Sequence, residues 1–496
     1  MEAKVSEGLP PPRVAASVAP APLSHREKRI IAVSMMVPVF LGSVDQSILA
    51  TSLPTIGRAL NDMHNLPWLI TSYLIASTAL TPLYGKFADI HGRRAALLIA
   101  LSIYIAASLF AASSTSMVML IIGRVAQGCG GGGLTAIAQM VLGDIASPKD
   151  RAKYYAYFSV AFTTAGGCGP ALGGWICDHL SWWVIFLWNF PLCIVAVVIA
   201  LTILRRLPRY DRPHQLDFLG AVLIMAASST FMLALNLGGV RYPWFSSPVL
   251  ALMASALVLG GGFVLRLLTA REPLIPVAIL ADPTARMAMV AHSFGWGSIL
   301  AINIFMPMYL QSTLGWSATA SGLSMMILMV TLNATAGFSS QLTGRVKHYK
   351  LLPNIFLVLA IGSILALSFS ANSMTSLRLE VILFLIGAGF GPTAPLTQVM
   401  LQNTVAMHHL GSAIGTMNFM RTLMSTILVA VFGVIVLANV PVGGPADTLA
   451  QRATGTSVTT FAHVFLGIAC TMVIAFAAML VIEEKPLEAT MPPPRQ

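Results

Sequence analysis

Two residues of opposite charge lie inside apolar segments that are long enough to cross a membrane. Asp45 occurs in VFLGSVDQSILATSLPTIG, residues 39–57, and Arg124 occurs in LIIGRVAQGCGGGG, residues 120–133. A charge at the centre of a membrane helix costs roughly 2.5–3.5 kcal/mol on insertion scales, so it is expected to have a function or a partner. A carboxylate can lose and regain its charge when its surroundings change. Asp45 is therefore a candidate for carrying a proton.

The depth of the two residues suggests that they belong to one site. Asp45 lies about eight residues, and Arg124 about seven residues, from the outer end of the predicted span that holds it. At 1.5 Å rise per residue both lie roughly 10–12 Å deep. We expect them to share one polar network, because ionisable groups within membranes face the interior and pair. A static structural pair is the alternative to a proton-coupling role.

The composition indicates that lipid surrounds the segments that position these charges. The chain has 496 residues, of which 56% are hydrophobic and 9% are charged, against about 25% charged in soluble domains. Its five cysteines include no CxxC pair, so neither a disulfide framework nor a zinc site is predicted. The motifs HExxH, GxSxG and GxxxxGK[ST] are absent, which argues against an enzyme and against direct ATP drive. We expect no catalytic residue, metal or cofactor.

Counting segments of about 20 mostly apolar residues predicts fourteen membrane spans. They are expected near 30–53, 66–85, 95–113, 117–142, 154–176, 183–204, 217–238, 248–269, 286–310, 319–341, 351–370, 378–401, 411–438 and 458–482. With both termini cytoplasmic, 23 of the 29 Lys and Arg residues fall in cytoplasmic segments and 4 in outer loops. This bias follows the positive-inside rule. The sequence predicts an all-α, polytopic protein of the inner or plasma membrane. The cytoplasmic bias explains its charge of +11 without a nucleic-acid partner, and none is expected.

An internal repeat divides the chain into halves. The loop GKFADIHGRR, residues 85–94, is echoed by GFSSQLTGRV, residues 337–346, at an offset of 252 residues. Repeated halves around a central site are typical of transporters, and two inserted helices would account for the offset. The predicted units are a disordered tail (1–29), a six-helix half (30–204), two additional helices with linkers (205–285), a second six-helix half (286–482) and a C-terminal tail (483–496).

Several motifs resemble those of one transporter family. GKFADIHGRR resembles the cytoplasmic-loop signature of the major facilitator superfamily, and residues 120–133 resemble its span-4 motif. AGGCGPALGG, residues 165–174, is similar to its antiporter-associated span-5 motif, and DQSILATSLP, residues 45–54, resembles the span-1 motif of fourteen-helix drug:proton antiporters. The resemblance covers nearly all of residues 30–482. It implies the major facilitator fold and multidrug efflux by alternating access.

The loop signature supplies the candidate gating residues, which are Gly85, Asp89, Gly92, Arg93 and Arg94. Glycine permits close approach and unusual backbone angles, and the basic residues hold the loop on the cytoplasmic face. A carboxylate such as Asp89 suits a helix N-terminus. The resemblance implies that Asp89 meets a helix across the interface between the halves, which would be the one beginning near Gly411 and Ser412. A solvated loop that only sets topology is the alternative.

The span-5 motif places Gly169, Pro170, Gly173 and Gly174 at its centre. Small residues let membrane helices pack closely, and proline removes a backbone hydrogen bond and bends the helix. The resemblance implies that this kinked face seals against the other half. Ordinary close packing is the alternative.

Polar and aromatic side chains within spans are candidates for a substrate cavity. The candidates are Gln127, Phe294, Trp296, Asn303, Asn333, Gln398 and Asn418. Arg421 is costly enough in a span to be expected in the interior. His292 could titrate near neutrality, although a lone histidine more often makes a fixed hydrogen bond.

We expect an exporter that exchanges inward protons for a hydrophobic drug, toxin or secondary metabolite, with Asp45 and Arg124 as coupling residues. Its predicted partners are protons, a small hydrophobic substrate and the lipid bilayer, and it is expected to act as a monomer and to contribute to antibiotic resistance. Two alternatives on the same fold remain open. One is a nutrient symporter or facilitator, and the other is a non-transporting sensor.

Overall fold

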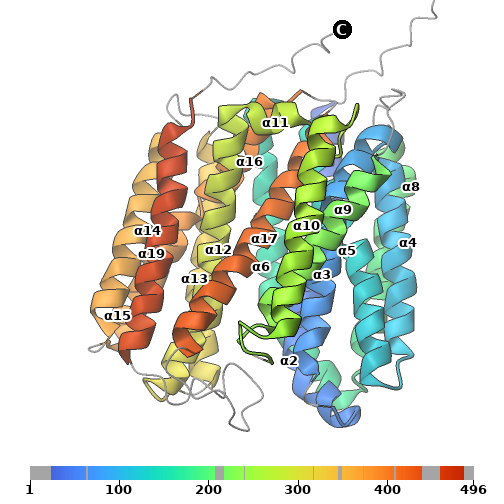
Figure 1. Cartoon of the computed structure of the whole chain (residues 1–496). Coiled ribbons are helices and arrows are strands. Elements are labelled where there is room, and N and C mark those ends of the chain that lie inside the picture. Colours follow the sequence, from blue (N-terminus) through green and yellow to red (C-terminus); the bar gives the residue numbers. More distant parts are fainter. Residues whose placement is uncertain are drawn as a thin grey trace, which may run out of the picture.

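The computed structural model describes residues 24–62, 65–206, 217–239, 241–316, 318–343, 349–371, 374–406, 409–437 and 458–484. Figure 1 shows long helices standing side by side in one bundle. The described part contains no β-strand, and one isolated bridge joins Gly238 and Tyr242. The predicted all-α class is therefore confirmed.

The helices α1 to α9 precede residue 240. They are α1 (His25–Ser34), α2 (Met36–Ala59), α3 (Leu66–His91), α4 (Arg93–Ala112), α5 (Met117–Ile145), α6 (Pro148–His179), α7 (Val184–Leu187), α8 (Asn189–Thr202) and α9 (Phe218–Leu237). The later helices are α10 (Ser247–Thr269), α11 (Val277–Ala281), α12 (Pro283–Ser312), α13 (Ala318–Thr343), α14 (Leu351–Phe369), α15 (Ser376–Phe390), α16 (Thr393–Thr404), α17 (Leu410–Leu437) and α19 (Val458–Val481).

Twelve helical segments of the described residues are long and apolar enough to cross a membrane. The other two predicted spans, 66–85 and 154–176, fall in α3 and α6. These helices have 26 and 32 residues, which exceeds the roughly 30 Å of a bilayer core at 1.5 Å per residue. They stand in the same bundle as the other twelve.

Some helix boundaries differ from the prediction. The first helix begins at His25, because Ser24 and Glu27 form a capping box, so residues 25–29 of the predicted disordered tail are helical. The predicted span 183–204 is divided into α7 and α8. The span 378–401 is interrupted at Gly391 and Pro392 between α15 and α16, where proline supplies no backbone N–H. The tail segments 1–23 and 485–496 lie outside the described residues.

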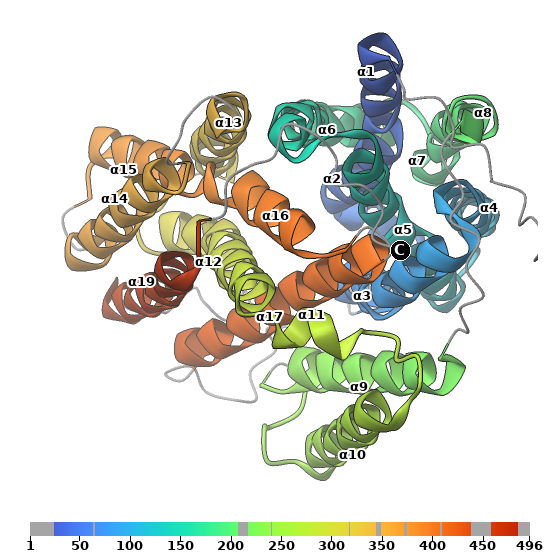
Figure 2. The ribbon, with the colours of Figure 1, turned by 90° about the horizontal axis from the view of Figure 1, so that it is seen from above.

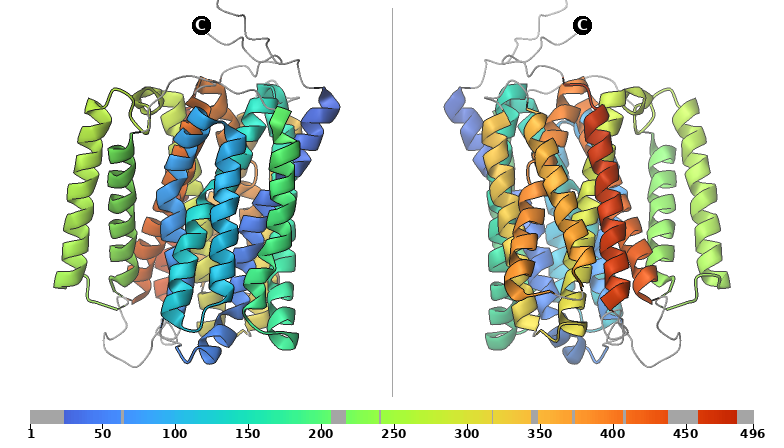
Figure 3. Two further views of the ribbon diagram at one scale, coloured as in Figure 1. Left: turned by 90° about the vertical axis from the view of Figure 1, so that its right-hand side faces the viewer. Right: turned by 90° about the vertical axis from the view of Figure 1, so that its left-hand side faces the viewer.

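The helices form two groups with a pair of helices beside them. Figure 2 shows α2–α8, which we call the first group, on one side and α12–α19, the second group, on the other. The helices α9 and α10 lie next to the place where α3 and α17 meet. The described residues nearest both termini lie at one end of the bundle, at the top of Figures 1 and 3. We call this the upper end and the opposite end the lower end. The helix α10 presents exposed apolar side chains such as Leu257 and Val258.

Helix α5 packs closely because of its glycine run. A Cβ atom on Gly130 would lie 2.6 Å from the Ala100 carbonyl oxygen on α4. A Cβ atom on Gly132 would lie 2.4 Å from the Ser77 carbonyl oxygen on α3. Small residues at membrane-helix interfaces allow backbones to approach in this way. The run thereby fixes α5, which carries Arg124, between α3 and α4.

Candidate functional site

Asp45 on α2 and Arg124 on α5 form a buried ion pair in the first group. The Arg124 Nη1 atom lies 2.7 Å from Asp45 Oδ2, and the two side chains are 0% and 4% exposed. The predicted shared network is therefore present, and it contains a direct contact between the charges. In an environment of low dielectric constant, removing one partner would leave the other charge buried and uncompensated, which costs much stability.

The Asp45 carboxylate accepts hydrogen bonds from two amides besides the guanidinium. Gln127 Nε2 donates to Asp45 Oδ1 at 3.1 Å, and Asn189 Nδ2 donates to the same oxygen at 2.7 Å. Gln127 and Asn189 are both fully buried. The Asn189 Oδ1 atom has no hydrogen-bond partner among the described residues. The carboxylate thus has three donors around it and an unused acceptor nearby.

The Arg124 guanidinium is held by neighbours that do not depend on Asp45. Its Nε atom donates to the Leu69 carbonyl oxygen at 3.0 Å, and Nη1 also donates to Gln127 Oε1 at 2.6 Å. Its central carbon lies 4.4 Å from the centroid of the Tyr73 ring, a distance suited to a cation–π interaction. These contacts would keep the guanidinium in position if the charge on Asp45 were removed.

Asn189 was not predicted as a site residue. It is an amide at the start of an otherwise apolar segment, NFPLCIVAVVIALT, and that isolation is the only sequence signal.

Hydrogen bonds to charged groups, such as the one that Asn189 donates to Asp45, contribute about 1.5–3 kcal/mol to stability. We expect Asn189→Leu to lower the thermal unfolding midpoint in detergent. The matched control is Asn303→Leu, since Asn303 Nδ2 donates only within its own helix, to Ile299 O at 2.9 Å. Equal midpoints for both variants would contradict a special role for Asn189.

A second charged cluster joins the two helix groups at the upper end. Asp89, near the end of α3, accepts hydrogen bonds from the backbone N–H groups of Gly411 at 2.9 Å and Ser412 at 2.8 Å, and from the Ser412 hydroxyl at 2.9 Å. Gly411 and Ser412 lie in the first turn of α17, so the carboxylate binds that helix at its positive end. The contact is the one that the sequence predicts. Its role as a gate stays a prediction.

Arg93 connects Asp89 to a further carboxylate. It lies 2.6 Å from Asp89 Oδ1 and 2.8 Å from Asp144 Oδ2 at the end of α5. Gly92, which precedes it, has a φ of +87°, a conformation that glycine adopts without strain. Arg94 has a buried Nε atom without a hydrogen-bond partner in the described part of the chain. We call Asp89, Arg93, Asp144, Gly411 and Ser412 the upper junction.

Arg151 on α6 adds another link between the groups. Its Nη1 atom donates to the Gln402 carbonyl oxygen at 2.9 Å and to Asn403 Oδ1 at 3.1 Å, and Nη2 donates to Gly143 O at 2.9 Å. Burial lowers the pKa of Arg151 to about 10, which still leaves it charged at neutral pH. It was not predicted, because its position among the basic residues of a loop resembles a topology signal.

The backbone is also close at the upper junction. A Cβ atom on Gly85 would lie 2.5 Å from the Gly411 carbonyl oxygen. Gly337, the counterpart of Gly85 in the internal repeat, has nothing within 4 Å of such an atom. The two halves of the repeat therefore differ, and only the first of these two glycines lies at a contact between the groups.

Several glycines in and beside the span-5 motif have open space next to them in this structure. Cβ atoms on Gly166, Gly167 and Gly174 would meet nothing within 4 Å, whereas one on Gly169 would lie 2.3 Å from the Ser47 Cβ atom on α2. Gly173 is buried, and the side chain of Pro170 is outside those described. Helix α6 nevertheless packs against α13 of the second group, so the role of this motif as a seal stays a prediction.

A small cavity lies between the two groups. Its volume is about 60 Å³. The lining residues come from both groups and are Gln139, Tyr155, Phe158, Ser159, Phe162, His292, Trp296, Leu332, Asn333, Ala336, Ala394, Pro395, Gln398 and Arg421. Three predicted cavity residues, Trp296, Asn333 and Gln398, are thus brought together. A volume of this size holds a few water molecules and is smaller than a site for a drug-sized molecule.

The other four predicted cavity residues lie elsewhere. Gln127 belongs to the Asp45 network. Phe294 packs against the core of the second group, and Asn303 donates within its own helix. Asn418 donates to Gln139 Oε1 at 2.7 Å and so joins the two groups. Their polarity or aromatic character alone did not indicate which side of the helix faces the cavity.

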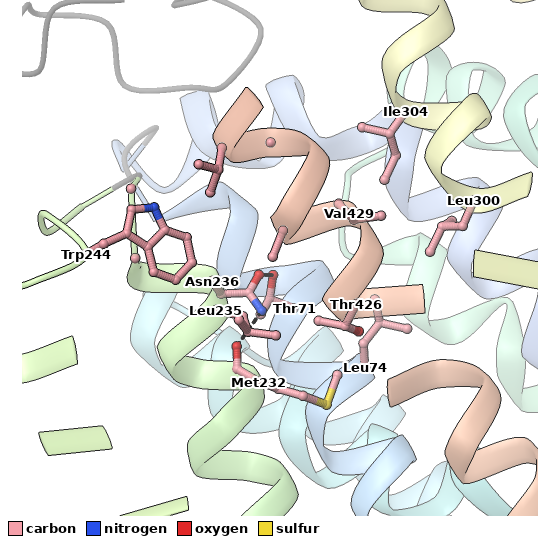
Figure 4. Close-up of a pocket in the computed structure, with 15 residues that line it drawn as sticks. Thr71, Leu74, Met232, Leu235, Asn236, Trp244, Leu300, Ile304, Thr426 and Val429 are labelled. Atoms are coloured by element: carbon pink, nitrogen blue, oxygen red, sulfur yellow. Dashed lines mark hydrogen bonds between the residues drawn. The ribbon is translucent and has the colours of Figure 1, made fainter. Parts of the chain in front are cut away.

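A larger cavity lies nearer the lower end, where α9 meets both groups (Figure 4). Its volume is about 240 Å³. It is lined by Thr71, Leu74, Met232, Leu235, Asn236, Gly238, Gly239, Trp244, Leu300, Ile304, Thr426, Val429, Ala430, Gly433 and Val434. None of these residues is charged, and a few polar groups, among them Thr71 and Asn236, face apolar side chains. Such a surface suits the hydrophobic part of a ligand.

Comparison with known proteins gives a consistent result. The sequence matches the family described as Major Facilitator Superfamily over residues 35–429. It is 29% identical over 415 residues to the multidrug transporter protein MdtP of Bacillus subtilis, covering 83% of this chain and 76% of that protein. It is 27% identical over 407 residues to the efflux pump dotC of Dothistroma septosporum, covering 81% and 70%. The chain spans about 60% of the length of two further relatives, from Mycobacterium tuberculosis.

The fold agrees with that of solved structures. The proton:xylose symporter XylE superposes with a TM-score of 0.63 at 13% sequence identity, covering 92% of this chain and 96% of that one. At this identity the likeness concerns the fold alone. It confirms the predicted arrangement of a polytopic, all-α transporter fold.

Proposed function

Because the chain belongs to the major facilitator superfamily, we propose that it is a proton-coupled exporter of hydrophobic drugs, toxins or secondary metabolites. The family and the fold make it a multi-pass membrane transporter rather than an enzyme. Relatives named as a multidrug transporter and an efflux pump support export of drug-like compounds. The observation that carries the proposal of proton coupling is the buried contact between Asp45 and Arg124.

The neighbours of Asp45 suit a carboxylate that changes its protonation state. When it is charged, Arg124, Gln127 and Asn189 all donate to it. When it is protonated, the Arg124 guanidinium keeps Leu69 O and Gln127 Oε1 as acceptors. Protonation therefore weakens the attraction of α2 to α5, while these two acceptors still hold the guanidinium. We propose that this change biases the alternation between access states.

The upper junction is the proposed cytoplasmic gate. We propose that the upper end lies in the cytoplasm, because the distribution of Lys and Arg along the sequence favours that orientation, and that the membrane is the cell membrane. Asp89 holds α17 to α3 in the described state, while Gly166, Gly167 and Gly174 on α6 face open space. In the proposed cycle this state is closed to the cytoplasm, and the junction parts when the site opens inward.

The larger cavity offers a surface for the hydrophobic body of the cargo. It lies between α3 of the first group and α12 and α17 of the second, so its shape would change with the alternation of the groups. We expect Ala430→Trp, which fills this cavity, to reduce export of bulky cargo about tenfold or more, with a smaller effect on compact cargo. Uptake by everted membrane vesicles of large and small dyes measures the ratio.

The control for this prediction is Leu257→Trp, which adds the same ring on α10 at a position that is 78% exposed. It should leave export of both dyes unchanged. If Ala430→Trp exports the bulky dye as well as the wild type does, the cavity is not part of the export path.

The experiment that tests the proposed function uses proteoliposomes, an imposed pH gradient and a panel of lipophilic dyes and antibiotics. Wild-type protein should accumulate at least one compound by moving it in the direction opposite to the flow of protons. Accumulation that needs a nutrient sugar and runs with the protons would instead indicate a symporter. Tight binding without flux of any compound would indicate a sensor.

A further inference from the structure

Arg421 is a membrane-embedded cation without a carboxylate partner. It lies on α17 and lines the small cavity between the two groups. Its side chain makes no hydrogen bond or ion pair with the described residues, and its guanidinium carbon lies 5.6 Å from the centroid of the Trp296 ring. Arg124, by contrast, has the Asp45 carboxylate at 2.7 Å. A cation in a membrane that lacks a protein partner is expected to serve a function.

The other polar groups around Arg421 do not supply a negative charge. The lining contains amides, hydroxyl groups and an imidazole but neither Asp nor Glu. The Trp296 Nε1 atom, which can only donate, has no hydrogen-bond partner in the part that the structure describes, and neither has His292 Nε2. His292 Nδ1 is already 2.9 Å from the Thr397 hydroxyl. Because the Thr397 hydroxyl donates to Thr393 O, the neutral imidazole donates to it from Nδ1 and its Nε2 is an acceptor. The unused donors are therefore those of Arg421 and Trp296.

Part of the remaining cavity wall is apolar. Phe158 and Phe162 from α6 face the second group, where Leu332 and Ala336 come from α13. The volume of about 60 Å³ has room for a small group such as a carboxylate but not for a whole drug-sized molecule. A ligand that fits both features has one small anionic group attached to a hydrophobic body.

We propose that Arg421, with the indole N–H of Trp296, recognises a carboxylate on the cargo, so that the exported compounds are lipophilic organic acids. This inference rests on the proposed export function and names the class of its substrate. An arginine pairs with a carboxylate through charge-assisted hydrogen bonds in fixed geometry. A lipophilic cation of similar size would meet the uncompensated guanidinium and would bind less well.

The test compares two probes that differ in one group, 2-naphthoate and the uncharged 2-naphthylmethanol. Equilibrium binding is measured with the purified full-length protein in detergent. Wild-type protein should prefer 2-naphthoate, and Arg421→Gln should weaken its binding more than about tenfold while changing that of the alcohol less than twofold. Arg421→Lys, which keeps the charge and is the safer variant for folding, should retain part of the preference. Arg378→Gln, a matched change at an exposed position, should behave like the wild type.

Three results would overturn the assignment. They are equal losses for both probes in Arg421→Gln, no loss for either probe, and displacement of 2-naphthoate by chloride without any flux of 2-naphthoate in vesicles. The last result would make Arg421 a site for inorganic anions. Failure of the export function itself is recognised separately, as specific binding of 2-naphthoate by wild-type protein that moves neither this probe nor any panel compound.

Discussion

Asp45→Asn is expected to abolish proton-driven export, with a loss of more than about a hundredfold, while cargo still binds with an affinity within about threefold of the wild type. Asparagine fills nearly the same space as aspartate, but its amide can neither bind nor release a proton near neutral pH. Flux in proteoliposomes under a pH gradient and cargo binding in detergent measure the two effects.

The single variant also leaves Arg124 without its counter-ion, which can cost about 3–5 kcal/mol in stability. A double variant separates the two effects. In Asp45→Asn combined with Arg124→Gln, both charges are removed, and the hydrogen bonds of Leu69, Gln127 and Asn189 have new neutral partners. We expect the double variant to regain thermal stability but not proton-driven flux. If it regains both, Asp45 and Arg124 are only a structural pair.

Gly85→Val is expected to prevent closure of the upper junction and to reduce export more than about tenfold. A Cβ atom at this position would lie 2.5 Å from the Gly411 carbonyl oxygen, and a backbone atom cannot move aside as a side chain can. Overpacking costs roughly 1–3 kcal/mol, which corresponds to about a 5- to 150-fold loss of the closed state. The helix itself should remain intact, because valine is tolerated in membrane helices.

Gly337→Val is the matched control, since Gly337 is the equivalent residue of the repeat and has open space around it. The state of the protein can be read from a cysteine at Ser159, which lines the cavity between the groups, in a background without other cysteines. A membrane-impermeant maleimide applied from the cytoplasmic side should label it faster in Gly85→Val than in Gly337→Val. Equal labelling and equal export would show that the upper junction is not a gate.

The sequence was informative where a physical cost had to be explained. Asp45 and Arg124 stood out because charges are expensive in lipid. Their matching depth predicted a shared polar network, within which the structure shows a direct contact. Asp89 and its partners Gly411 and Ser412 followed from the loop signature and the preference of anions for helix N-termini. The all-α class followed from the length and spacing of the apolar runs.

The residues that were missed carry no such local signal. Asn189 meets Asp45 across 144 positions of the chain, and Arg151 meets Gln402 across 251. Such contacts depend on how helices rotate about their axes, which an apolar run does not specify when it is hydrophobic all around. The same uncertainty explains why Asn303 and Phe294 were predicted to line a cavity but do not line the one between the groups.

The proposal that export is coupled to protons is tested most directly by proton movement driven by cargo alone. Vesicles containing the protein and a trapped pH-sensitive dye start without a pH gradient, and a transported compound is then added on one side. The account predicts that protons move opposite to the cargo in wild-type vesicles and stay still in the stable double variant of Asp45 and Arg124. Cargo movement without proton movement in the wild type, or equal proton movement in both, would contradict it.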